Sequence, residues 1–212
     1  MRARLLGGML MAAAMTTPLG AGGGPGVALT AQATKQAGRL VITYRLENQG
    51  PPVIYVRDLM AGYAGAEQKI DADGAYVFWE QPATARIVRG VLNVPSDMDV
   101  AKRPVPFARK VAPGEAVEGR ISLAMPIPEH SPFYPPPQKP RLVQCSKIRL
   151  LIGWVEEQEG MLPTPRDVGG TEVLVLKGSW KGPIQRLAER AVGLPVDLQT
   201  YTDAFDRSLP SR

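Results

Sequence analysis

Short runs of alternating apolar and polar residues recur along this chain, and they constrain its fold more than any other feature. In residues 39–47, every second side chain from Leu40 to Leu46 is apolar, and most of the side chains between them are polar. A period of two residues is that of a β-strand with one buried face. The same alternation returns in residues 117–125, after the Pro113-Gly114 turn, and in residues 147–154. The chain is therefore expected to be built mainly from half-buried strands.

Seven or eight such strands, separated by turn residues such as Asn48 to Pro52, predict an all-β fold. Alternation argues against a parallel sheet, whose strands are apolar on both faces. A barrel is the alternative architecture, but irregular spacings and two long insertions favour an antiparallel β-sandwich over residues 27–178. The remaining expected strands are residues 53–57, 76–79, 85–94 and 172–177, with a weaker one at 27–33.

The order of these strands and turns resembles that of immunoglobulin-like bacterial domains. The resemblance covers roughly residues 27–178, and it implies the architecture only, because fold does not determine function. The chain departs from true immunoglobulin domains in one respect. Its single cysteine, Cys145, cannot form the disulfide that joins the two sheets of those domains.

The N-terminus has the features of a secretory signal peptide. Arg2 and Arg4 precede an eleven-residue apolar run, and small residues follow Pro18. Eleven residues are too few to span a bilayer as a helix, which takes about 20. We expect cleavage after residue 21, a flexible linker at 22–26, no transmembrane helix after cleavage, and a periplasmic or secreted protein.

The C-terminal residues 179–206 change in character, and a short helix is expected there. Ile184, Leu187, Ala188 and Ala191 recur at helical spacing, and Gly193 follows them. Ten helical residues are too few to be stable alone, so the helix is expected to dock on the sandwich. Residues 207–212 are expected to form a disordered tail.

The charge balance argues against nucleic-acid binding. The formal net charge is +5, from 25 basic and 20 acidic residues, and loss of the two signal-peptide arginines lowers it to +3. The basic residues occur in pairs rather than in a long run, and aromatic residues do not alternate with them as in a stacking platform. The acidic residues Glu156, Glu157 and Glu159 are interpreted as a solvated loop rim.

One segment is similar to a calcium-binding loop. Asp71, Asp73 and Glu80 fall at ligand positions, and Gly74 falls at the required turn. Lys69, however, occupies the first position, where a carboxylate is needed. A turn with Asp and Gly supplying the local geometry is therefore favoured over a calcium site, and no metal or other cofactor is expected.

A second candidate is a hydrolase that uses His130 with Cys145 or an acidic residue. Histidine can act as a general base and cysteine as a nucleophile, but no nucleophile motif accompanies them. A bystander histidine is the favoured interpretation. If alternation continues from residue 147 back to Cys145, the thiol lies on the polar face with Lys147 and Arg149 and is partly accessible.

The Pro-rich segment at residues 125–140 is the most distinctive part of the chain. Seven prolines stiffen it, and Phe133 and Tyr134 stand beside Pro135 and Pro136. Stiff Pro-aromatic segments lose little entropy on binding, so these four residues are the candidate surface for another envelope protein. The alternative, which we favour, is a rigid crossover with Phe133 packed on the core.

These observations together favour an exported, non-catalytic binding or accessory module of the cell envelope. The absence of an assembled catalytic motif and the export signal are the grounds for this interpretation.

Overall fold

All regular structure in the described part of this computed structural model is β-strand. The structure describes residues 26–65, 67–96, 98–100, 104–134, 140–178 and 183–200. The expected signal peptide, residues 22–25 of the linker and the tail at 207–212 lie outside them. The strands are β1 (Val27–Gln36), β2 (Arg39–Asn48), β3 (Ile54–Ala64), β4 (Glu67–Asp71), β5 (Tyr76–Glu80), β6 (Thr84–Arg89), β7 (Phe107–Val111), β8 (Ala116–Ala124), β9 (Ile127–Pro128), β10 (Arg141–Cys145), β11 (Lys147–Glu156), β12 (Met161–Val168), β13 (Thr171–Gly178), β14 (Arg186–Val192) and β15 (Val196–Thr200).

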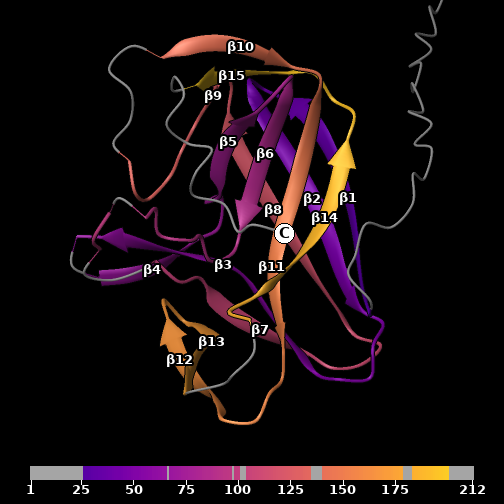
Figure 1. Cartoon of the computed structure of the whole chain (residues 1–212), viewed down its shortest axis with the longest axis vertical. Coiled ribbons are helices and arrows are strands. Elements are labelled where there is room, and N and C mark those ends of the chain that lie inside the picture. The colour runs from indigo at the N-terminus through magenta and orange to yellow at the C-terminus, as the bar shows by residue number, and fades with distance from the viewer. Residues whose placement is uncertain are drawn as a thin grey trace, which may run out of the picture.

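The strands form a sandwich-like body with two projecting hairpins (Figure 1). One layer is the three-stranded sheet β1-β2-β8, and the facing layer contains β14, β11, β6 and β5. A small sheet, β10-β15-β9, closes one end of the body. At the other end, β11 pairs with β3, which continues through β7 to the β12–β13 hairpin, and β3 also carries β4.

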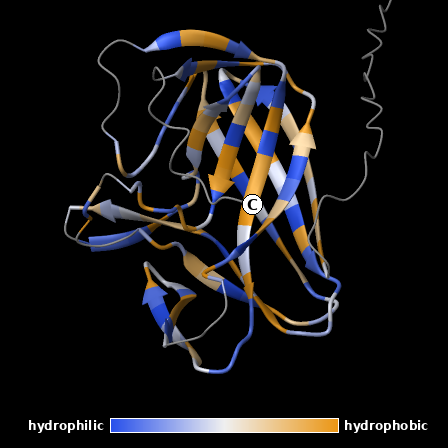
Figure 2. Ribbon diagram, in the orientation of Figure 1, coloured by the Kyte–Doolittle hydropathy of each residue, from blue (hydrophilic) through white to orange (hydrophobic). Residues whose placement is uncertain are grey.

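The main core lies between these layers. Leu40, Ile42 and Leu46 of β2 face Ile148, Leu150 and Ile152 of β11, and all six side chains are fully buried in one cluster. The small sheet adds Cys145, Val196 and Leu198 to the same cluster. The two layers bury one face each because apolar and polar residues alternate along the central strands, as Figure 2 shows.

A second, smaller cluster covers the opposite face of the β11 layer. It contains Met60, Tyr76, Phe78, Val88, Leu92 and Leu151, and the partly buried Phe133 and Tyr134 pack against it. Both faces of β6 are therefore covered, and all six of its residues are buried. The strand ends at Arg89, five residues before the end of the expected strand at 85–94.

The expected C-terminal helix is wrong: these residues form strands β14 and β15. β14 pairs with β11 over seven residues, from Ile148↔Val192 to Trp154↔Arg186. In this conformation Leu187 and Ala188 lie on opposite faces, and each joins a different cluster. The apolar spacing fits a helix equally well, but the open edge of β11 offers hydrogen-bond partners to the backbone of β14 along its whole length.

The expectation of an antiparallel sheet with seven or eight strands also needs correction. β11 pairs with β6 in parallel, and β15 pairs with β9 in parallel. Short strands whose alternation is weak, such as β4, β7, β9, β10 and β12, add to those that were expected. The all-β, sandwich-like character is confirmed.

Candidate functional site

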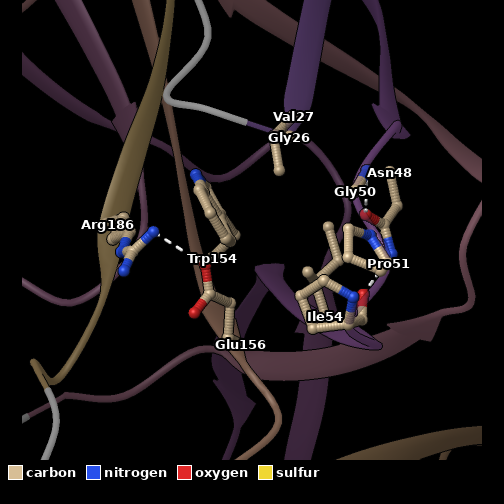
Figure 3. Close-up of a pocket in the computed structure, with 10 residues that line it drawn as sticks. Gly26, Val27, Asn48, Gly50, Pro51, Ile54, Trp154, Glu156 and Arg186 are labelled. Atoms are coloured by element: carbon tan, nitrogen blue, oxygen red, sulfur yellow. Dashed lines mark hydrogen bonds and ion pairs between the residues drawn. The ribbon is translucent and has the colours of Figure 1, made fainter.

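A small apolar cleft opens where the two layers of the sandwich separate (Figure 3). Its volume is about 300 Å³. The first residues of β1, the β2–β3 turn, the end of β11 and the start of β14 form its walls. The lining residues are Gly26, Val27, Asn48, Gly50, Pro51, Pro52, Ile54, Trp154, Glu156 and Arg186. Since β1 and β14 lie side by side without a hydrogen-bonded ladder, the cleft marks one end of an open seam.

The walls are built by local backbone geometry. Gly26 has φ of +90°, and its carbonyl accepts a hydrogen bond of 2.8 Å from the Gln49 amide. The Asn48 side chain orders the turn: its Nδ2 donates to the Pro52 carbonyl at 2.8 Å, and its Oδ1 accepts from the Gly50 amide at 3.1 Å. A Cβ on Gly50 would lie 3.3 Å from the Gly26 Cα, so glycine at both positions lets the two segments approach.

One ion pair stands at the cleft, and one large aromatic ring forms its side. Arg186 Nη1 donates to Glu156 Oε1 at 2.7 Å, and both side chains are partly exposed. The same guanidinium lies over the Trp154 ring, 5.4 Å from its centroid. Trp154 is 1% exposed, and its indole N–H has no hydrogen-bond partner among the described residues. The cleft is therefore an apolar recess beside a balanced pair of charges.

A second cavity, of about 280 Å³, contains a buried polar network. The Tyr44 hydroxyl donates to Asp58 Oδ2 at 2.7 Å, and the Arg109 guanidinium binds both oxygens of the same carboxylate. Arg89 Nη1 donates to the Tyr44 hydroxyl at 3.2 Å. Burial raises the pKa of Tyr44, and the nearby Asp58 carboxylate raises it further, so the phenol stays protonated.

The arginines of this network are engaged with the protein itself. Arg89 also donates to the carbonyls of Gly74 and Ala72, and Arg109 donates to the carbonyl of Glu118. Their donors hold the turn after β4 and the strand β8 in place. The network is therefore interpreted as a structural lock rather than as a site for an anionic ligand.

The structure does not support the pairing of His130 with Cys145. Cys145 is fully buried in the main core, and burial raises the pKa of its thiol to about 11. His130 is exposed; its backbone pairs with Val77, and its ring lies 6.0 Å from that of Tyr76. A nucleophilic cysteine needs a thiolate, which this environment disfavours.

The expected partial exposure of Cys145 is wrong for a geometric reason. Ser146 separates β10 from β11, and the two strands belong to different sheets. Alternation from Lys147 and Arg149 therefore does not continue across Ser146, and Cys145 faces the core as the last residue of β10.

Two of the three calcium-ligand candidates, Asp73 and Glu80, are engaged in separate ion pairs. Asp73 pairs with Arg39 and Arg120, whereas Glu80 binds Arg149 at 2.7 Å. The Gly74 amide donates to the Asp71 carbonyl at 3.1 Å, which is the geometry of a simple turn. Within the described ranges, no group of three acidic, histidine or cysteine residues is placed to hold a metal ion.

The described part of the Pro-rich segment, residues 125–134, is anchored near its start. The buried Glu129 carboxylate accepts hydrogen bonds from the Trp79 amide and the Thr200 hydroxyl. Phe133 and Tyr134 are half-buried against the second cluster. Pro135 and Pro136 lie outside the described residues.

Sequence reasoning missed the cleft and the buried polar network around Asp58. Trp154 ends an alternating strand and is buried in the core, but no local pattern shows that the β2–β3 turn and β14 lie against it. Gly50 with Pro51 and Pro52 signalled only a turn. The one available signal was the density of glycine and proline near Gly26 and Gly50, which permits close approach of two backbones.

Comparisons with known proteins do not assign a family. No protein-family model, curated protein or solved structure matches this chain. Among the residues that the structure describes, no helix has the length and apolar character needed to cross a membrane.

Proposed function

We propose that this protein is an exported, non-catalytic binding module of the cell envelope, and that it holds its partner at the apolar cleft. The observation that carries the proposal is the recess beside Trp154, at the open seam between the layers. Exposed Pro51 and Pro52 extend its apolar wall to the surface. Export, and hence the envelope location, rests on the N-terminal pattern alone.

The size of the cleft favours a protein partner. About 300 Å³ is at the lower limit of small-molecule pockets, which range from about 300 to 1,000 Å³. Such a recess accommodates one or two apolar side chains of a larger partner. Because Glu156 and Arg186 neutralise each other, the apolar contact supplies most of the binding free energy at this point.

The test is partner capture from envelope extract by the mature chain and by Pro51→Trp. Residue 51 is exposed at the edge of the cleft, so an indole there blocks entry without changing the core. We expect the captured partner to be lost. Pro165→Trp, on the exposed surface of β12, is the matched control and should capture as the parent does. Equal capture by all three proteins would refute the cleft as the binding site.

A further inference from the structure

The hydrogen-bond pattern of the β1-β2-β8 sheet shows which backbone groups of β1 have no strand partner. In an antiparallel ladder, opposite residues alternate between hydrogen-bonded and non-hydrogen-bonded pairs. The Gln49 amide donates to the carbonyl of Gly26, which is opposite it in the β1–β2 register, so Gly26 belongs to the hydrogen-bonded set and its neighbour Val27 does not. Asn48, opposite Val27, donates its amide to Glu115 on the other side of β2, which agrees. The amide and carbonyl of Val27 therefore point away from β2.

These two groups face the seam and have no backbone partner there. β14 is the next strand on this side, and no backbone hydrogen bond joins β1 to β14 within the described ranges. Val27 is only 4% exposed, and it lines the cleft. Buried backbone groups are almost always paired in folded proteins. An unpaired amide and carbonyl in the wall of a cleft therefore mark a place for a hydrogen-bonding ligand.

The opposite wall of the cleft carries a donor and an acceptor of its own (Figure 3). Arg186 uses Nη1 to bind Glu156 Oε1, and the remaining polar atoms of these two side chains have no hydrogen-bond partner among the described residues. A neutral peptide group presents the complementary combination, one C=O acceptor and one N–H donor. The balanced pair of charges thus suits an uncharged backbone better than an ion.

We propose that the cleft takes its partner as an extended peptide segment, which adds to the edge of β1 at Val27 and places an apolar side chain beside Trp154. The inference rests on the proposed function and names the conformation of the partner. Successive residues of an extended chain turn their N–H and C=O groups to opposite edges. One residue of the segment exchanges hydrogen bonds with Val27, and the next residue presents its N–H to Glu156 and its C=O to Arg186. Strand addition of this kind draws affinity from the main chain and specificity from alternate side chains.

The spacing of the strands limits the segment to the cleft. Neighbouring strands lie about 4.8 Å apart, so a strand inserted between β1 and β14 needs about 9.6 Å between them. The Cα atoms of β1 and β14 approach within 8 Å, so the segment cannot run along the whole seam. It is confined to the end where the layers part, and it leaves the cleft past the exposed Pro51 and Pro52.

The test uses acetyl-Thr-Val-Thr-Val-Thr-amide, an uncharged strand-forming peptide, and follows the backbone amides of β1 by NMR. We expect a dissociation constant of about 1 mM, which is the weak end of specific affinity. With about 5 mM peptide, hydrogen exchange of the Val27 amide should slow by about fivefold. Exchange of the Ala28 amide, which is already in the β1–β2 ladder, should not change. The same peptide N-methylated at both valines keeps its side chains but loses two donors, and it should not bind.

A pair of protein variants tests the opposite wall. Glu156→Ala removes the acceptor and should weaken the peptide by about fivefold or more. Glu159→Ala removes a carboxylate that is exposed after β11, and it should bind the peptide as the parent does.

An unchanged Val27 amide at about 5 mM peptide, or equal binding of the N-methylated peptide, would overturn the proposal. If Pro51→Trp abolishes partner capture in that case, the proposed function stands and only the extended conformation is refuted. Equal capture by the parent, Pro51→Trp and Pro165→Trp would refute both.

Discussion

At the scale of single residues, the buried network of Tyr44, Asp58 and Arg109 depends on one glycine. Gly119 of β8 is paired with Tyr44 of β2, and a Cβ at residue 119 would lie 2.1 Å from the Tyr44 Cζ. The missing side chain leaves room for the ring, whose hydroxyl reaches Asp58. Asp58 is fully buried, and its charge is balanced by Arg109. A carboxylate in this position requires both partners, because an unpaired buried charge is strongly destabilising.

Gly119→Ala should therefore lower the free energy of unfolding by roughly 2–4 kcal/mol, since displacement of Tyr44 removes a buried hydrogen bond and strains the packing. Urea denaturation measures the effect. Gly193→Ala is the control, because a Cβ there meets nothing within 4 Å and should change stability by less than about 0.5 kcal/mol. Similar stability of the two variants would contradict the described position of Tyr44.

The buried thiol predicts a loss of stability at high pH. Burial raises the pKa of Cys145 to about 11, against an ordinary value of 9.0. The protonated thiol therefore contributes fully to the free energy of unfolding below pH 9, and this contribution is lost as the pH rises toward 11. A pKa difference of two units between the folded and unfolded chain corresponds to about 2.7 kcal/mol of unfolding free energy at high pH. Cys145→Ala removes this term. The difference between parent and variant in urea midpoints should thus change between pH 8 and pH 10.5, and a constant difference would show an accessible thiol.

At the scale of elements, an unpaired strand edge determines the conformation of a segment whose apolar pattern fits both a helix and a strand. Residues 186–192 carry apolar residues at helical spacing, yet they pair with β11. Gln185, the residue before β14, is also held by hydrogen bonds. Its Oε1 accepts from the Val91 amide at 2.8 Å, and its Nε2 donates to the Val91 carbonyl at 2.7 Å. The side chain thus acts as a strand partner for the segment that follows β6. Tertiary pairing outweighs a marginal local preference.

The Pro-rich segment is also an element held by tertiary contacts. Phe133 is half-buried on the second cluster, so Phe133→Ala should cost about 1–3 kcal/mol, less than the 3–5 kcal/mol of a fully buried Phe. A thermal melt measures this. The exposed Pro132 next to it provides the control variant Pro132→Ala.

Loss of partner capture by Phe133→Ala with an unchanged melting temperature would instead favour the segment as the binding surface. That outcome would also move the proposed site away from the cleft.

At the scale of the whole molecule, the last strands complete the fold. β14 covers the edge of β11, and β15 is the central strand of the small sheet that closes one end. Ala188, Val196 and Leu198 are fully or almost fully buried in the main core. The folded unit therefore extends to residue 200, whereas the sequence pattern placed the end of the sandwich at residue 178.

A chain that stops at residue 178 should fail to fold cooperatively. Removal of β14 and β15 exposes one edge of β11 and leaves β10 without its neighbour, so buried backbone groups lose their partners. Amide NMR dispersion and a urea transition measure the outcome, with residues 26–200 as the reference chain. A sharp transition in the shorter chain would show that the C-terminal strands are an accessory layer.

The class of the fold and its central strands follow from local sequence pattern. Alternation in β2, β8 and β11 is a local property, and the sheet faces follow from it at once. Local pattern does not reveal the roles of Gly119 and Asp58, because each is an ordinary residue in its own strand. The pairing of β2 with β8 and of β3 with β7 brings them into the buried polar network.

The burial of Cys145, the conformation of residues 186–192 and the position of the cleft depend instead on contacts between distant segments. Burial of the thiol depends on a change of sheet at Ser146, and β14 depends on the edge of β11. The cleft depends on Gly26, Gly50 and Trp154, which are distant in sequence and meet where two layers part. Contacts of this kind arise from long-range pairing, whose free energy is shared among segments, so no single segment carries the signal.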